Sequence, residues 1–349
     1  MQETSETTSG SVRVDLLGGT IDLDPINHIL EATVTLNMAT NLKAKVILEK
    51  KDENFIEINS LDYDDVTKVK NDHLNSSSDD QLINDYHHIA FVLLIVKYFK
   101  PKTGVSLQLS SGSPAGAGLG GSSAMGVTLF KALAKHFQVE EKYSKTNVIS
   151  IVKNIEAKIL NQGVTGYQDY YPALYGGILA LKPSYDSIEV EQLYTEELRI
   201  YLKSHLRLIY SGISRNSGIN NWEVYKSFFD GNSETRSGLK DISQLSHQAH
   251  QAIKDANYGE LLSLVCEEGR IRENLFSNIV PEAIQDFITQ SKQKFSQVIG
   301  AKMCGAGGGG CFLIILNKPF SDEQENTFLH LINSFNMKKL ELDISKPCG

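Results

Sequence analysis

The stretch that decides the expected fold of this chain is Pro114-Ala-Gly-Ala-Gly-Leu-Gly-Gly-Ser-Ser-Ala124. Before it, residues 105–110 alternate apolar and polar side chains, and this period of two predicts a half-buried strand. After it, apolar side chains recur at every fourth position from Met125 to Phe137, which predicts a helix that begins near Ser122. A glycine-rich turn between a strand and the N-terminus of a helix is typical of a phosphate-binding loop.

The chemistry of phosphate binding explains each part of this stretch. Glycines let backbone N–H groups approach phosphate oxygens, and the helix N-terminus adds unpaired donors and a positive dipole end. Ser122 and Ser123 stand where a helix cap belongs, and a hydroxyl there can reach a phosphate-bound Mg²⁺. The stretch lacks the lysine of the GxxxxGK[ST] loop. It also differs from a dinucleotide-binding loop, which follows the first strand of a βαβ unit. The alternative is a flexible Gly-Ser linker, which the flanking strand and helix disfavour.

Length and composition indicate an ordinary globular protein. The chain has 349 residues, which suits two fused domains, with 41% apolar and 22% charged residues. A net charge of −8 argues against nucleic acid or acidic membranes as partners. No apolar run is long enough to span a membrane, and residues 1–10 lack the features of a secretory signal, so we expect a disordered leader there. The four cysteines have no metal-type spacing, which favours reduced thiols in a cytoplasmic protein.

The remaining patterns predict a mixture of strands and helices. Residues 71–80 are rich in Asn, Ser and Asp and are expected to form an exposed loop. A change of pattern near residues 185–200 suggests a boundary between a domain at 11–190 and a domain at 191–349. Strands are expected at 12–17, 33–38, 44–48 and 206–210, helices at 87–99, 145–160 and over most of 219–294, and a strand, turn, strand, helix and strand from about 298 onward.

Two further glycine-containing motifs flank this central part. Arg13-Val-Asp-Leu-Leu-Gly-Gly-Thr-Ile-Asp22 ends a predicted strand at a Gly-Gly pair. Lys302-Met-Cys-Gly-Ala-Gly-Gly-Gly-Gly-Cys311 lies between two predicted strands, either as a plain hairpin or as a second close backbone approach to a ligand.

Residues 114–124 resemble the second signature of the GHMP kinases, Pro-x-x-x-Gly-Leu-Gly-Ser-Ser-Ala, with Gly121 in place of the first serine. Residues 302–311 resemble the third signature and residues 13–22 the first. In the first signature, Gly19 and Thr20 replace the Glu-His pair of galactokinase, and the run Gly-Gly-Thr-x-Asp is similar to the heptose 7-phosphate kinase branch. The resemblance covers nearly the whole chain from Val12 onward.

This resemblance implies an α+β fold of two domains, with a ribosomal-protein-S5-like N-terminal domain and a ferredoxin-like C-terminal domain. It also implies ATP and Mg²⁺ as cofactors. Ser122 and Glu156 match the positions that hold Mg²⁺ in the family, although a solvated helix-face carboxylate is the alternative for Glu156. The residues implied to bind ATP are Pro114, Gly116, Gly118, Leu119, Gly120, Gly121, Ser122, Ser123 and Ala124.

Asp169 is the candidate catalytic residue. It lies in residues 163–177, which resemble the heptose-kinase form Gly-x-Gln-Asp-Gln-x-x-Ala-x-x-Gly-Gly, with Tyr170 in place of the second glutamine. Asp169 would act as general base or orient the acceptor hydroxyl, with Arg13 holding it ionised and steadying the alkoxide; a plain turn residue is the alternative. The residues implied to bind the substrate are Gly18, Gly19, Thr20, Asp22, Gln168, Arg215, Gly305, Gly307 and Gly308.

The expected function is transfer of the ATP γ-phosphate to a hydroxyl of a small sugar or sugar phosphate, such as a heptose 7-phosphate, with the anomeric hydroxyl as the expected acceptor. Arg215 would contact a substrate phosphate or else a surface carboxylate. A mevalonate-pathway kinase is an alternative that Asp22 and Gln168 disfavour. A non-catalytic sugar sensor is another, and the presence of Ser122, Glu156 and Asp169 counts against it. The oligomeric state does not follow from the sequence.

Overall fold

The structure is a computed structural model that describes residues 5–62, 65–160, 165–213 and 219–348. The chain folds into two compact units that alternate along the sequence. Unit 1 contains the residues up to Val12, Leu42–Ser113 and Gly120–Leu174; unit 2 contains Arg13–Asn41, Pro114–Leu119 and the chain from Tyr175 onward. These units are made of interleaved segments, whereas the domains expected from the sequence, 11–190 and 191–349, are each continuous. The expected domain boundaries remain a prediction.

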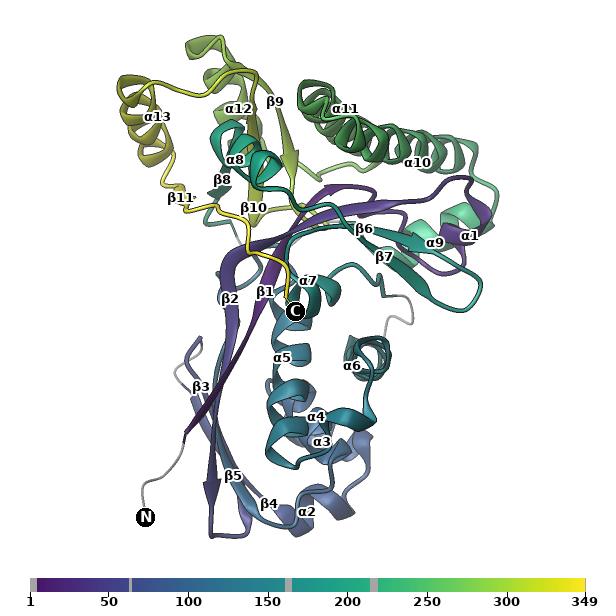
Figure 1. Ribbon diagram of the computed structural model, residues 1–349, viewed down its shortest axis with the longest axis vertical. Coiled ribbons are helices and arrows are strands. Elements are labelled where there is room, and N and C mark those ends of the chain that lie inside the picture. Colours follow the sequence, from purple (N-terminus) through teal and green to yellow (C-terminus); the bar gives the residue numbers. More distant parts are fainter. Residues whose placement is uncertain (1–4, 63–64, 161–164, 214–218, 349) are drawn as a thin grey trace. The chain divides into compact units, whose positions relative to one another are not determined.

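Unit 1 packs helices on one side of a small sheet, as Figure 1 shows for α4, α5 and α6. Its strands follow the order β4-β3-β5, and residues 45–51 of β2 pair antiparallel with β5. The strands are β2 (Thr35–Lys51), β3 (Phe55–Ser60), β4 (Asp65–Lys70) and β5 (Gly104–Ser110). The helices are α2 (Asn71–Ser76), α3 (Asp79–Asp85), α4 (Ala90–Tyr98), α5 (Gly121–His136), η1 (Glu140–Lys142), α6 (Lys145–Leu160) and α7 (Tyr171–Tyr175).

An aromatic cluster fixes α5 within unit 1. The Phe130 ring lies 4.8 Å from the Phe99 ring and 5.1 Å from the Tyr143 ring, measured between centroids. Phe130 is fully buried, and burial of such a side chain stabilises a fold by about 1.5–3 kcal/mol. Helix α5, at whose N-terminus the glycine run ends, is therefore held in place by its packing within unit 1.

Unit 2 is built on a four-stranded antiparallel sheet in the order β11-β8-β10-β9. Its central strand β10 (Cys311–Leu316) is buried along its whole length, whereas β9 (Val298–Met303) lies at the edge beside α11 (Tyr258–Leu275). Figure 1 shows α10 and α11 side by side. The other elements are α1 (Ile26–Ile29), β6 (Ile178–Pro183), β7 (Ile188–Gln192), α8 (Glu196–His205), β8 (Leu206–Tyr210), α9 (Asn221–Phe229), α10 (Ser233–Lys254), α12 (Glu282–Lys294), α13 (Asp322–Ser334) and β11 (Lys338–Leu340).

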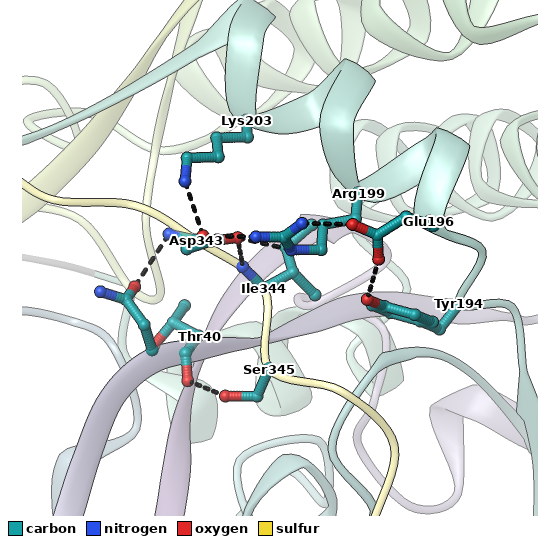
Figure 2. A network of polar contacts seen from close by, with 9 residues as sticks. Thr40, Tyr194, Glu196, Arg199, Lys203, Asp343, Ile344 and Ser345 are labelled. Atoms are coloured by element: carbon teal, nitrogen blue, oxygen red, sulfur yellow. Dashed lines mark hydrogen bonds and ion pairs between the residues drawn. The ribbon is translucent and has the colours of Figure 1, made fainter.

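The last residues of the described chain are tied down within unit 2 (Figure 2). The Asp343 carboxylate accepts hydrogen bonds from Arg199 Nε at 2.8 Å, Arg199 Nη2 at 2.7 Å and Lys203 Nζ at 2.7 Å. Ser345 Oγ donates to the Thr40 carbonyl at 2.7 Å. The segment after β11 is thus linked to α8 on one side and to β2 on the other.

Several expected elements are confirmed by the structure. Helix α6 and strand β8 have the bounds expected from the sequence, and α5 begins at Gly121, one residue before the expected start. The expected strand, turn, strand, helix and strand near the C-terminus are β9, β10, α13 and β11. None of the helices in the described ranges is long and apolar enough to cross a membrane.

Three expectations about local structure were wrong. Strand β1 (Glu6–Leu17) begins at Glu6, so the expected disordered leader cannot extend to residue 10. The strands expected at 33–38 and 44–48 are one strand, β2. The loop expected at 71–80 contains α2 and the start of α3, because Ser78 accepts the Gln81 N–H as a helix cap and polar composition alone does not exclude a helix.

Candidate active site

The glycine run passes from unit 2 into unit 1 between Leu119 and Gly120. Gly120 is the N-cap of α5 and has a φ of 68°, in the left-handed region that favours glycine. Gly120 has no side chain with which to cap the first turn of α5. The first N–H groups of a helix have no carbonyl partner within the helix, so this turn offers donors to an anion.

Asp169 lies directly against this turn within unit 1. A Cβ built on Gly120 would be 3.2 Å from Cβ and Cγ of Asp169. The structure therefore places the carboxyl of Asp169, the candidate catalytic residue, beside the N-terminus of α5. A larger residue at position 120 would push this carboxyl away.

The structure also explains why a glycine occupies position 121. A Cβ at this position would lie 2.7 Å from the hydroxyl oxygen of Ser113. The Ser113 hydroxyl thus occupies the space beside the helix start that a side chain at position 121 would fill. No sequence motif pointed to Ser113, although this residue immediately precedes the glycine run.

Glu156 is a buried carboxylate rather than a solvated one. Its residue is 8% exposed, and its Oε2 accepts hydrogen bonds from Ser123 Oγ at 2.7 Å and Tyr170 Oη at 2.8 Å. Burial raises the pKa of Glu156, and the hydrogen bonds from Ser123, Tyr170 and Ser122 oppose that rise without cancelling it. A nearby cation would favour the ionised form of this carboxyl.

The oxygen atoms of Glu156 and Ser122 fit a magnesium ion. Both are hard oxygen donors, and Ser122 is one of the side chains that oppose the rise in the pKa of Glu156. The described residues contain no group of three or more His, Cys, Asp or Glu side chains that could hold a metal. A nucleotide-bound Mg²⁺ needs only one or two protein oxygens, so this finding is compatible with the predicted pair.

Tyr170 is a functional candidate whose contact was missed. It is 2% exposed and its hydroxyl donates to Glu156. Burial, followed by the charge of Glu156, raises the pKa of Tyr170, so the hydroxyl stays protonated and acts as a donor. The neighbouring Gln168 is buried as well. In the sequence, the only indication of a special role for Tyr170 was that it replaces the second glutamine of the motif.

In unit 2, the third glycine motif packs backbone to backbone against residues 114–119. A Cβ on Gly118 would lie 2.6 Å from the Cys304 carbonyl oxygen, and a Cβ on Gly310 would lie 2.5 Å from the Gly116 carbonyl oxygen. Cys311 N donates to the Ala117 carbonyl at 2.8 Å. The motif is thus more than a plain hairpin, and it carries the expected substrate residues Gly305, Gly307 and Gly308.

Arg13 supports the same part of the glycine run. Its Nη1 donates to the Gly118 carbonyl, and its backbone N donates to the Leu119 carbonyl at 3.0 Å. Arg13 is buried in unit 2, whereas Asp169 belongs to unit 1. The expected effect of Arg13 on the ionisation of Asp169 stays a prediction.

The first motif forms a tight turn in unit 2. Gly18 has a φ of 77°, and a Cβ there would lie 2.3 Å from the Val34 carbonyl oxygen. Its N–H donates to Glu268 Oε2 at 3.1 Å. Thr20 and Asp22, two of the expected substrate residues, are buried beyond this turn. Arg215, the expected phosphate contact, lies outside the described residues.

Comparison with known proteins agrees with this geometry. The GHMP kinases N terminal domain family matches residues 87–177, which include α5, Glu156 and Asp169. The chain is 26% identical over 333 residues to the bifunctional fucokinase/GDP-fucose pyrophosphorylase of Arabidopsis thaliana, a match that covers 90% of this chain and 30% of that protein. The chain thus spans less than a third of the plant protein.

Two further relatives are single kinases. The mevalonate kinase of Saccharolobus solfataricus is 25% identical over 229 residues, which cover 65% of this chain and 67% of that protein. The D-glycero-alpha-D-manno-heptose 7-phosphate kinase of Campylobacter jejuni is 24% identical over 322 residues, which cover 87% of each.

The fold matches as well. The crystal structure of Methanococcus jannaschii mevalonate kinase superposes with a TM-score of 0.74 at 18% identity, over 99% of this chain and 100% of that chain. The expected α+β fold is confirmed by this match. The family match of residues 87–177, the relatives and the fold thus all point to similarity with the GHMP kinases.

Proposed function

We propose that this protein is an ATP-dependent kinase that phosphorylates a hydroxyl group of a sugar or sugar phosphate. The observation that carries the proposal lies within unit 1. The carboxyl of Asp169 is in contact with Gly120 at the start of α5, and the first turn of that helix also bears Ser123, which is hydrogen-bonded to the buried Glu156. An anion-binding helix start, a carboxylate for a hydroxyl proton and oxygens for a cation are the parts that phosphoryl transfer to an alcohol requires.

The mechanism assigns a role to each of these groups. The N–H groups of the α5 start and of the glycine run bind the triphosphate of ATP. Ser122 and Glu156 would hold Mg²⁺, which neutralises phosphate charge when it is bound. Asp169 orients the acceptor hydroxyl and accepts its proton as the new P–O bond forms, while the bond between the γ-phosphorus and the bridging oxygen breaks and ADP leaves. The resemblance of residues 13–22 to the first family signature assigns Arg13 to the developing alkoxide.

A sugar acceptor is supported by buried polar groups and by the relatives. Asp22 and Gln168 are buried side chains of a kind that reads hydroxyl groups, and an isoprenoid acid offers few of them. Fucokinase and the heptose 7-phosphate kinase are sugar kinases by name. We propose the anomeric hydroxyl as the acceptor and a heptose 7-phosphate as one candidate substrate, with Arg215 as its phosphate contact.

A mevalonate kinase is the second candidate, because a protein of that name is 25% identical over 229 residues.

The location of the protein and its binding partners are also proposed. We propose a cytoplasmic location, because the four cysteines are too few for a disulfide-stabilised secreted fold and have no metal-type spacing. A small molecule is the proposed partner, and the net charge of −8 supports the expectation that nucleic acid is not bound.

A coupled assay of ADP release tests the proposal across acceptors. The panel contains L-fucose, galactose, a heptose 7-phosphate and mevalonate, each with ATP and Mg²⁺. We expect turnover with at least one sugar and none with mevalonate. Turnover with mevalonate alone would replace the sugar assignment by the second candidate, and absence of turnover with every acceptor would favour a non-catalytic sensor.

A further inference from the structure

Two oppositely charged side chains of α11 are buried in unit 2. Glu268 and Arg272 are four residues apart, so they lie on the same face of the helix, and they are 0% and 2% exposed. Charged side chains are rarely buried to this extent unless they are paired. No motif in the sequence pointed to either of them.

Glu268 holds the turn of the first motif. Its Oε2 accepts the Gly18 N–H at 3.1 Å, and Thr35 Oγ1 donates to the Gly18 carbonyl at 3.1 Å. Both polar backbone groups of Gly18 are therefore fixed by side chains. This turn begins the segment 18–22, which we assign to the acceptor.

Arg272 holds the third glycine motif. Its Nη1 donates to the Met303 carbonyl at 2.9 Å, and its Nη2 donates to the Gly305 carbonyl. Gly305 approaches the run 114–119 closely, since a Cβ on it would lie 2.7 Å from the Gly118 carbonyl oxygen. The planar guanidinium thus fixes two carbonyls of the loop that supports the glycine run.

Lys302 and Asp15 connect these two contacts. Lys302 Nζ lies 2.8 Å from Asp15 Oδ2 and 3.7 Å from Glu268 Oε1, and Arg272 Nη1 lies 3.9 Å from Asp15 Oδ2. Two acids and two bases therefore neutralise one another in a buried cluster. Burial raises the pKa of Glu268 to about 6 in spite of Lys302, with Asp15 adding to the rise.

We propose that Glu268 and Arg272 are positioning residues with separate tasks: Glu268 sets the acceptor-binding turn and Arg272 sets the loop behind the nucleotide-binding run. The proposal rests on the proposed kinase function. Both side chains act by hydrogen bonding to backbone groups. Both belong to α11, and the charged cluster with Asp15 and Lys302 joins them to each other.

Steady-state kinetics of two conservative variants separate the tasks. Glu268→Gln keeps the shape and an acceptor oxygen but loses the charge that orders the cluster, so we expect the KM of the acceptor to rise about tenfold and the KM of ATP to change less than about twofold. Arg272→Lys keeps the charge but cannot hold two carbonyls in a plane, so the opposite pattern is expected. The matched controls are Glu267→Gln and Arg270→Lys, which change a half-buried and an exposed residue of the same helix.

The result that would overturn the proposal is an equal change of both KM values in each variant, or no change in either. Hydrogen exchange gives a readout independent of turnover: it should accelerate at residues 16–22 in Glu268→Gln and at residues 303–310 in Arg272→Lys. If the wild-type protein turned over no acceptor, the proposed function alone would fail. The exchange pattern would still decide the positioning roles, because uniform acceleration over unit 2 in both variants would contradict them.

Discussion

At the scale of single residues, the candidate site depends on what surrounds one carboxylate. Glu156 is buried and accepts hydrogen bonds from Ser123 and Tyr170. These contacts restrict the carboxylate to one orientation, which favours binding of a cation whose ligands must be placed within a few tenths of an ångström. Tyr170 thus has a structural role toward the predicted metal site.

Replacing Tyr170 by phenylalanine tests that role. Tyr170→Phe removes only the hydroxyl that donates to Glu156, so we expect binding of Mg²⁺ in the presence of ADP to weaken about tenfold. Calorimetric titration of Mg²⁺ measures the effect directly. Tyr143→Phe, which changes a tyrosine of the aromatic cluster in the same unit, is the control. Equal affinity in Tyr170→Phe and the control would contradict the role.

The pair Ser113 and Gly121 gives a second residue-scale prediction. Because the Ser113 hydroxyl fills the space beside Gly121, we expect Ser113→Ala to raise the KM of ATP about threefold to tenfold. The double variant Ser113→Ala/Gly121→Ser should recover most of the loss, because it moves the hydroxyl to the other side of the same space. A double variant that is no better than Ser113→Ala would show that this hydroxyl has no part in nucleotide binding.

Some site residues could be predicted from the sequence and others could not. Asp169, Ser122 and Glu156 belong to local motifs, and the structure places them near the start of α5. Glu268 and Arg272 carry no motif, and their partners Gly18 and Gly305 lie 250 and 33 residues away along the chain. Contacts of this kind arise from packing, which periodicity and composition do not describe.

At the scale of elements, the two glycine loops of unit 2 depend on close backbone approach. Gly118→Ala would place a Cβ 2.6 Å from the Cys304 carbonyl oxygen at a φ of 74°. Backbone atoms cannot move away as the end of a side chain can, so we expect a loss of about 2 kcal/mol in the free energy of unfolding and at least about tenfold weaker binding of a non-hydrolysable ATP analogue. Thermal unfolding and calorimetry measure the two effects.

Gly259→Ala is the matched control for this substitution. A Cβ at Gly259, in the first turn of α11, meets no atom within 4 Å. Because alanine has a higher helix propensity than glycine, we expect a gain of about 0.5–1 kcal/mol in stability and no change in nucleotide binding. The claim that Gly118 lies too close to Cys304 for a side chain would be wrong if Gly118→Ala were as stable as Gly259→Ala and bound the nucleotide as tightly.

Periodicity explains which elements were predictable. Helices α5 and α6 show a regular apolar face, and β5 alternates cleanly, so their patterns were sufficient. The short helices α2 and α3 are mostly polar, and their residues resemble a loop in composition. Strand β2 was divided because its central residues vary in exposure where it passes from unit 2 to unit 1.

At the scale of the whole molecule, the chain enters and leaves each unit more than once. Sequence patterns are local, so they suggested a single boundary near residue 190 rather than interleaved units. The C-terminal segment illustrates the difference, because residues 343–345 complete contacts to α8 and to the Thr40 region of β2 (Figure 2). Its removal would therefore affect β2 and α8, which lie far apart in the sequence.

Asp343→Asn tests the contribution of this segment to stability. Burial raises the pKa of Asp343, but hydrogen bonds from Arg199, Lys203 and the Ile344 N–H outweigh it and lower the value to about 2. Because the folded pKa is depressed, the stabilisation is present above about pH 4 and is lost as the pH falls toward 2. We expect Asp343→Asn to lose about 1–2 kcal/mol at pH 7 and clearly less at pH 3.

Urea unfolding at both pH values measures this difference, with Asp241→Asn, an exposed aspartate of α10, as the control. A loss that is the same at pH 3 and pH 7 would mean that the carboxylate charge of Asp343 does not stabilise the fold.

The most direct test of the central claim is transfer of labelled γ-phosphate from ATP to a sugar, with wild-type protein and Asp169→Asn compared side by side and the product identified by mass spectrometry. We expect a phosphorylated sugar from the wild-type protein. In the variant we expect at least about a 10²-fold loss of rate, with nucleotide affinity unchanged within about twofold. Equal rates for the two proteins would contradict the account.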